Sequence, residues 1–304
     1  MDIEYLKQAY FELDNPIPFL KFFIKSISVK DYYTFYWAVE CLTLEKNKDP
    51  NGISFSHLGY LLKKIEDDSS FAARLSTIIE LVLGVENGSY CSECGFFRTI
   101  EQVGNAFNML SAISQEGKSS AEYGEEFKEV YNKEIAFCPN CENLMKDVIE
   151  WGADKNKHAF IRVRDSIITK ESFEEFKQIV CHQNMPDYND DYIDPALEEE
   201  LKEVERLRNK NIAFPSLEKQ MCCVIAGSAY TFETLKNLSL RKFVLLLRTI
   251  DAKLHYQIYK MNENSGAVTF KTGLDHWIYE TKKSRFDNIV SLDSIKDKLK
   301  HVAK

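Results

Sequence analysis

Apolar residues recur at steps of three and four in several segments of the chain, which is the spacing of an amphipathic helix. Ser239 can cap the clearest of these segments, and residues 264–266 (Asn-Ser-Gly) can end it. At about 1.5 Å per residue, this helix is roughly 35 Å long. Its apolar stripe consists of Leu240, Phe243, Leu247, Ile250, Leu254 and Ile258.

Start and stop signals predict further helices and two short strands. Ser70 and Gly84 bound one helix, Ser172 opens a capping box, and Pro195 occupies a first helical turn. The predicted helices are residues 32–44, 70–84, 142–151, 172–182, 195–210 and 217–230. Partly β-branched apolar runs predict strands at residues 22–29 and 160–164. The polar span 111–126 predicts a loop, or an insertion with a helical part.

Composition fits a chain with a sizeable apolar core. The 304 residues are 44% hydrophobic and 28% charged, and 7 Pro and 12 Gly are few for a many-turned β-sandwich. No apolar run approaches the roughly 20 residues that span a bilayer, and the acidic N-terminus lacks the features of a signal peptide. We therefore expect a non-membrane, cytosolic protein, in which 8 cysteines favour metal binding or buried thiols over disulfides.

Charge is unevenly distributed along the chain. The net charge is −8, but residues 235–304 contain 14 Lys and Arg against 7 Asp and Glu, a balance of +7. The first 234 residues therefore carry −15. A basic segment of this kind can contact nucleic acid or an acidic protein. A solvated helix surface explains the same charges and is the interpretation that we favour.

Two Cys-x-x-Cys units are the sharpest chemical signal in the chain. A two-residue gap lets both sulfurs of a tight turn face one ion, and zinc favours four such ligands in a tetrahedron. Gly95 follows the first unit, where such a turn often needs positive φ. All four coordination positions would be filled by protein, so the predicted zinc is structural and not catalytic. The predicted ligands are Cys91, Cys94, Cys138 and Cys141.

Other interpretations of the cysteines stay open. Buried free thiols, a redox-active pair, or iron held by the same four ligands would also fit the spacing. Cys181 and His182 are candidates for additional ligands. Otherwise Cys41, Cys181, Cys222 and Cys223 are predicted to be buried small apolar residues, because each lies in an apolar helical context.

These elements predict the fold class and the domain organisation. We expect a mainly α fold with minor β, in which helical domains surround a zinc-ribbon-like four-cysteine knuckle module with an insertion. The predicted boundaries are 1–88 for an N-terminal strand-plus-helix domain, 89–165 for the zinc-binding module, and 166–304 for a C-terminal helical domain.

No catalytic residue is predicted. The chain contains no GxxxxGK[ST] loop, no GxGxxG after a strand, no HExxH and no GxSxG. These absences favour a non-enzymatic protein. A zinc-stabilised enzyme, whose site assembles only in space, stays a further hypothesis.

Two segments carry a resemblance to a known class of proteins. Residues 29–52 begin with Val-Lys-Asp-Tyr and end in a Pro-Asn-Gly turn, and residues 232–287 combine a long helix with a late His-Trp pair and basic residues. Together they resemble baseplate hub or tail-assembly (chaperone-like) proteins from the tail modules of contractile-tailed bacteriophages. The resemblance covers roughly a quarter to a third of the chain. The cysteine-bearing middle is not part of it, and Ser239 stands where a Pro is usual.

The resemblance implies a non-enzymatic structural or assembly protein of the virion tail or baseplate, present in the host cytoplasm during assembly. Its implied partners are other phage tail proteins, within an oligomeric assembly and without a membrane. The alternative is a zinc-ribbon nucleic-acid-binding or transcription-associated protein. Residues 92–140 carry eight Glu against four Lys and Arg, which argues against phosphate binding by the knuckles.

Overall fold

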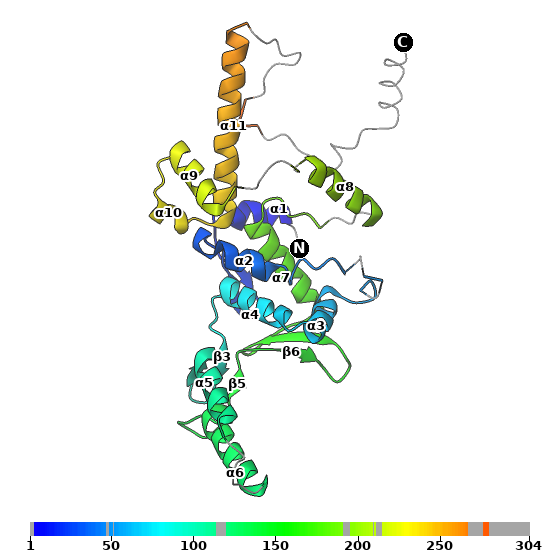
Figure 1. The fold of residues 1–304 in the computed structure, drawn as a ribbon, viewed down its shortest axis with the longest axis vertical. Helices are drawn as coiled ribbons and strands as arrows, with labels where there is room; N and C mark the ends of the chain where they lie inside the picture. Colours follow the sequence, from blue (N-terminus) through cyan, green and yellow to red (C-terminus); the bar gives the residue numbers. More distant parts are fainter. Residues whose placement is uncertain are drawn as a thin grey trace. The chain divides into compact units, whose positions relative to one another are not determined.

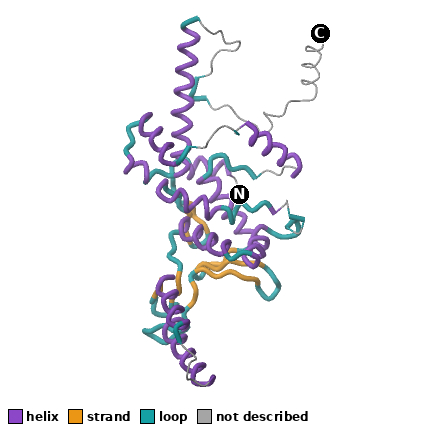
Figure 2. The backbone as a smooth tube through the Cα atoms, in the orientation of Figure 1, coloured by secondary structure: helices purple, strands orange, loops and turns teal. Residues whose placement is uncertain are grey.

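The computed structural model describes residues 3–46, 49–50, 52–113, 120–190, 195–208, 210, 215–266 and 276–279. Helices dominate and the sheets are small (Figure 1, Figure 2), so the predicted fold class, mainly α with minor β, is confirmed. The chain forms two compact units, Met1–Val244 and Leu245–Lys304. None of the helices in the described ranges is long and apolar enough to cross a membrane.

The core of the first unit is built from helices that pack in pairs. α4 (Ser70–Leu83) contacts α2 (Tyr32–Val39), and α3 (His57–Asp67) contacts both α4 and α7 (Lys170–Asn184). Within α4, apolar residues at steps of three and four are buried at Leu75, Ile78 and Val82, and Gly84 ends the helix, as predicted, with a φ of 64°. The spacing of three and four therefore identified the face of α4 that meets the core.

A β-hairpin lies before α2. β1 (Ile17–Phe19) pairs antiparallel with β2 (Phe22–Ile24), so a strand forms within residues 22–29 but is shorter than predicted. The N–H groups of Lys25 and Ile27 then donate to Val82 O and Asn184 Oδ1, which ties the extended chain to α4 and α7. The remaining N-terminal elements are α1 (Ile3–Leu6), the π-helical turn η1 (Lys7–Phe11) and the 3-10 turn η2 (Val29–Asp31).

The predicted helix at residues 142–151 is wrong. This segment forms the strands β5 (Lys146–Asp147) and β6 (Ile149–Ala153). β6 pairs with β7 (Ala159–Val163), which contains the predicted strand, and β7 pairs with β8 (Ser166–Ile168). Val148 and Ile149 are buried, and β7 contacts α3. Strand pairing and burial of this face override the modest helix propensity of the segment.

Helices form most of the C-terminal part. α7 begins at Lys170, earlier than predicted, and its capping box uses Thr169 and Ser172. α8 (Pro195–Arg208), α9 (Leu217–Gly227) and α11 (Leu240–Asn264) confirm predicted helices, and α10 (Phe232–Lys236) is a further short one. Leu240 and Phe243 are fully buried at the start of α11.

Contacts between helices cross the predicted domain boundaries. α7, from the third predicted domain, contacts α3 and η1, from the first. The three-way division at 1–88, 89–165 and 166–304 stays a prediction. Among the other cysteines, Cys41 and Cys181 are buried as predicted, but Cys222 and Cys223 are exposed. That part of the prediction is wrong, because α9 buries Met221 and Val224 instead.

Candidate metal site

The two cysteine pairs lie in turns next to short β elements. β3 (Gly88–Tyr90) leads into the first turn and β4 (Phe97–Thr99) leaves it, while the second turn lies between Phe137 and Leu144, which form an antiparallel bridge. β3 also pairs with β5. Between the turns run α5 (Ile100–Ser111), α6 (Ser120–Tyr131) and the π-helical turn η4 (Asn132–Ala136). The expected insertion therefore has a large helical part; its residues 114–119 lie outside the described ranges.

The first turn has the geometry of a metal-binding knuckle. Gly95 N–H donates to Cys91 O at 3.0 Å, and Cys91 N–H donates to Phe96 O at 2.9 Å. Gly95 has a φ of 74°, in the left-handed region that glycine enters without strain. The turn therefore folds back on itself immediately after Cys94, and both cysteines face the same side.

The second turn repeats these hydrogen bonds at equivalent positions. Glu142 N–H donates to Cys138 O at 2.9 Å, and Cys138 N–H donates to Asn143 O at 2.8 Å. Glu142 takes the place of Gly95 and has a φ of 58°, although it is not a glycine. The two turns are thus two copies of one backbone arrangement, which the letters of the sequence suggested only through their Cys-x-x-Cys spacing.

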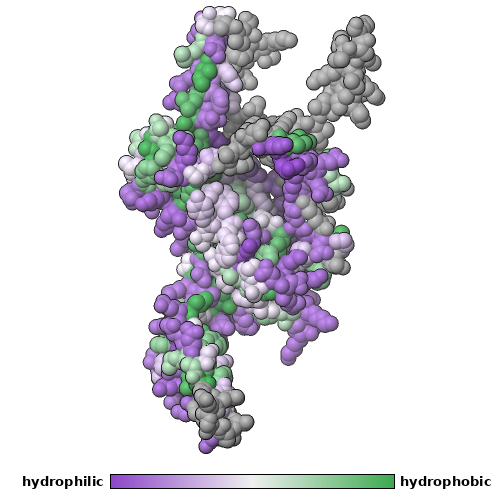
Figure 3. Space-filling view, viewed as in Figure 1, coloured by the Kyte–Doolittle hydropathy of each residue, from purple (hydrophilic) through white to green (hydrophobic). Residues whose placement is uncertain are grey.

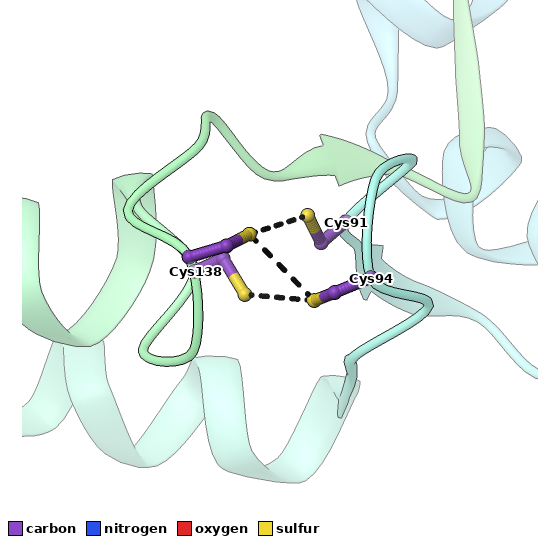
Figure 4. A group of neighbouring side chains, drawn as sticks. Cys91, Cys94 and Cys138 are labelled. Atoms are coloured by element: carbon purple, nitrogen blue, oxygen red, sulfur yellow. Dashed lines mark hydrogen bonds between the residues drawn. The ribbon is translucent and has the colours of Figure 1, made fainter.

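The four sulfurs of the knuckles converge on one point. Sγ–Sγ distances are 3.4 Å between Cys91 and Cys141, 3.4 Å between Cys94 and Cys138, and 3.7 Å between Cys94 and Cys141. All four ligand atoms lie within 4.8 Å of one another, and Figure 4 shows the side chains directed towards each other from the two turns. A tetrahedron with metal–sulfur bonds of about 2.3 Å has edges of about 3.8 Å. Disulfide bonds, at about 2.05 Å, do not fit these separations.

Burial divides the cluster into an inner and an outer side. Cys91 and Cys138 are fully buried and pack with Met145 and Phe96, whereas Cys94 is exposed and Cys141 is half-buried. Asn143 Nδ2 also donates to Cys141 Sγ at 3.4 Å. A metal held here would thus be shielded on one side by apolar side chains and reachable by chelators from the other.

The pKa values of the thiols reflect how closely the four sulfurs lie to one another. The N–H of Cys94 is the main donor to Cys91 Sγ and lowers the pKa of Cys91 to about 7. Burial raises the pKa of Cys138, but N–H groups of its own knuckle and the Cys94 sulfur bring it below its usual value. The Phe96 N–H lowers the pKa of Cys94, yet neighbouring sulfurs, Cys138 first, raise it to about 12. Thiolates this close oppose one another's ionisation, and a divalent cation removes that opposition.

The structure brings together the four cysteines that the sequence predicted as ligands. Cys181 and His182, the candidate additional ligands, lie on α7 and are not members of this cluster. Sequence reasoning missed Arg98, whose buried guanidinium contacts the carbonyl oxygen just before Cys138. The signal that could have found it is an arginine four residues after a cysteine pair in an otherwise acidic segment.

By its geometry, the cluster belongs to the class of closed four-cysteine centres that can hold one metal ion. Comparison with known proteins returned no matching family model, no matching curated protein and no matching solved structure.

Proposed function

We propose that Cys91, Cys94, Cys138 and Cys141 bind one zinc ion and that this ion has a structural role. The convergence of four sulfurs within 4.8 Å carries the proposal. Zinc accepts four thiolates in a tetrahedron, and four protein ligands leave no coordination position for a water nucleophile or a substrate. The ion therefore cross-links the two knuckles and does not take part in a reaction.

Metal analysis tests the zinc site directly. The chain, purified without added metal, should contain about one zinc per molecule, and Cys138→Ser should lose it, because three thiolates bind zinc more weakly than four. Cys222→Ser is the matched control, since Cys222 is exposed on α9 and lies outside the cluster. If the site held iron in place of zinc, the protein would be coloured, and the proposed identity of the metal would have to be changed to iron. A wild-type chain without any bound metal would contradict the proposal.

We further propose that the protein is a non-enzymatic structural or assembly component that binds other proteins, in the tail or baseplate of a contractile-tailed bacteriophage. The sequence resemblance at residues 29–52 and 232–287 supports the tail assignment. Exposed apolar side chains support a protein-binding role: Leu254, Ile258 and Met261 on α11 are 53%, 53% and 71% exposed, and Figure 3 shows apolar surface along this helix. Exposed apolar patches of this kind mark interaction sites.

Fractionation of infected cells tests this assignment. The protein should co-purify with other tail proteins, in finished tails or in their assembly intermediates. Absence from both would contradict the tail role. Binding of DNA or RNA at low salt, with a steep decrease as salt rises, would instead favour the nucleic-acid-binding alternative. The acidic charge of the knuckle region argues against nucleic-acid binding by the knuckles.

A further inference from the structure

Arg98 links the first knuckle to the entry of the second. It lies on β4, directly after the first knuckle, and is 7% exposed. Its guanidinium donates three hydrogen bonds to backbone oxygens: Nη1 to Ile135 O at 3.0 Å, and Nη2 to Lys133 O and Phe137 O at 3.1 Å each. Because Phe137 directly precedes Cys138, one side chain holds the end of the insertion beside the second pair of ligands.

These carbonyl groups lie at the end of a helical segment, where the last carbonyls have no intrahelical partner. Nearby backbone donors satisfy some of them: Phe137 N–H donates to Asn132 O at 2.9 Å, and Met145 N–H donates to Ala136 O at 2.8 Å. Arg98 satisfies three more. A guanidinium suits this position, because it carries five donors in one rigid plane and its charge is favourable at a helix C-terminus.

The backbone of Arg98 is itself fixed. Arg98 pairs with Ser89 across β3 and β4. The guanidinium carbon of Arg98 lies 5.6 Å from the centroid of the Phe96 ring, over its face. Gly88 permits this close pairing, since a Cβ there would lie 2.1 Å from Arg98 O. The guanidinium therefore projects from a rigid strand, and none of its three hydrogen bonds involves a cysteine sulfur or depends on a metal.

We propose that Arg98 is a positioning residue, which holds the second knuckle against the first so that the four thiolates are already grouped when the metal arrives. The proposal rests on the proposed zinc site. Cys94 and Cys138 are separated by 43 residues, and bringing the ends of such a loop together costs conformational entropy. Arg98 closes part of this loop before metal binding, so the ion does not have to order the insertion by itself.

Cobalt titration of the full chain tests the role of Arg98, because Co²⁺ replaces zinc and reports thiolate ligation by absorption. Arg98→Ala should weaken Co²⁺ binding by roughly 10- to 100-fold, because the hydrogen bonds that hold the loop closed are lost and the ion must then order the loop. The bands at saturating Co²⁺ should still be those of four thiolates, since every ligand is retained. Millimolar guanidinium should restore part of the Co²⁺ affinity of Arg98→Ala by occupying the space that the side chain left, whereas ammonium at the same concentration should not.

Arg162→Ala is the matched control. Arg162 lies on β7, in the separate sheet of β6, β7 and β8; its side chain is 40% exposed and pairs with Glu150, so its loss should leave Co²⁺ affinity unchanged. Wild-type affinity in Arg98→Ala, or an equal loss in Arg162→Ala, would overturn the proposal. If circular dichroism shows Arg98→Ala to be unfolded, Arg98→Lys decides: intermediate affinity supports positioning and unchanged affinity overturns it. A wild-type chain that binds neither Co²⁺ nor Zn²⁺ would instead refute the metal site.

Discussion

Substitution of Cys138 by serine should loosen the knuckle module while the helical core around α4 and α7 stays folded. The proposed zinc ion would cross-link a loop of 43 residues between Cys94 and Cys138. Chain-entropy arguments assign about 4 kcal/mol to a cross-link that closes a loop of this length. The hydrogen bonds of Arg98 close part of the same loop in the absence of metal, so we expect a local loss of between about 2 and 4 kcal/mol.

Native-state hydrogen exchange measures this loss residue by residue. The informative amides are those of Cys91, Gly95 and Cys138, whose acceptors are the carbonyl groups of the knuckles themselves. Because 1.4 kcal/mol corresponds to a tenfold change, these amides should exchange about 30- to 700-fold faster in Cys138→Ser. Treatment of the wild-type chain with a chelator should have the same effect, since it removes the same cross-link.

Two different results of the exchange measurement would contradict this prediction. Unchanged exchange in the knuckles, in both Cys138→Ser and the chelated chain, would mean that no metal contributes to their stability. Equal acceleration in α4, whose Leu75, Ile78 and Val82 are buried away from the cysteine cluster, would mean that the module and the helical core unfold together. Cys222→Ser serves as the control in each measurement, because its thiol lies outside the cluster.

Further predictions concern the core and the strands. Glu174→Gln should lower stability at neutral pH by about 1–2 kcal/mol, because Lys177, whose side chain is 3% exposed, loses a carboxylate partner. The loss is no larger because solvent screens the partly exposed Glu174. Burial raises the pKa of Glu174, but contacts with His57 and Lys177 lower it to about 2 from its usual 4.5; its contribution is therefore present above pH 4.5 and lost as the pH falls towards 2. Urea unfolding of wild type and Glu174→Gln across this range should show the two curves converging in acid, and a constant gap would refute the assignment. Phe243→Ala should cost about 3–5 kcal/mol because Phe243 is fully buried, whereas Leu254→Ala, at an exposed position, should cost less than about 0.5 kcal/mol; equal shifts in thermal unfolding would contradict the burial. Gly88→Ala should separate β3 from β4, since the new Cβ would lie 2.1 Å from a carbonyl oxygen of β4, and wild-type exchange rates at β3 in this variant would speak against that close approach.

The grouping of cysteines within each turn could be predicted from the sequence because the information for it is local. Two residues between cysteines are enough to place both sulfurs on one side of a turn, whatever surrounds the turn. The apolar faces of the helices α4 and α11 could also be predicted from local information, since a spacing of three and four places residues on one face of a helix. The approach of one knuckle to the other depends on residues far apart in the chain. It could be predicted only because a tetrahedral ion requires four ligands and each knuckle supplies two.

The features that sequence reasoning missed depend on partners far along the chain. The composition of residues 142–151 is typical of a helix, but β6 pairs with β7 and the segment becomes part of a sheet. Cys222 and Cys223 are exposed because α9 buries its other face. Arg98 gains its role from carbonyl groups more than thirty residues away, and nothing in its own neighbourhood identifies them.

The size of the buried apolar cluster explains why the knuckle module needs cross-links. Its buried members are Cys91, Cys138 and Met145, with Phe96 and Cys141 packed against them, and its strands have two or three residues each. Among the described residues between β3 and β6, the other buried apolar ones are Ala106, Leu110 and Val148. A core this small cannot offset the conformational entropy of ordering the module, and small domains of this kind depend on metals or other staples. The four thiolates and the Arg98 guanidinium supply the missing stabilisation at two neighbouring points. Removal of either should therefore act on the two knuckles and the strands β3, β4 and β5 beside them, and leave intact the helices that have an apolar core of their own.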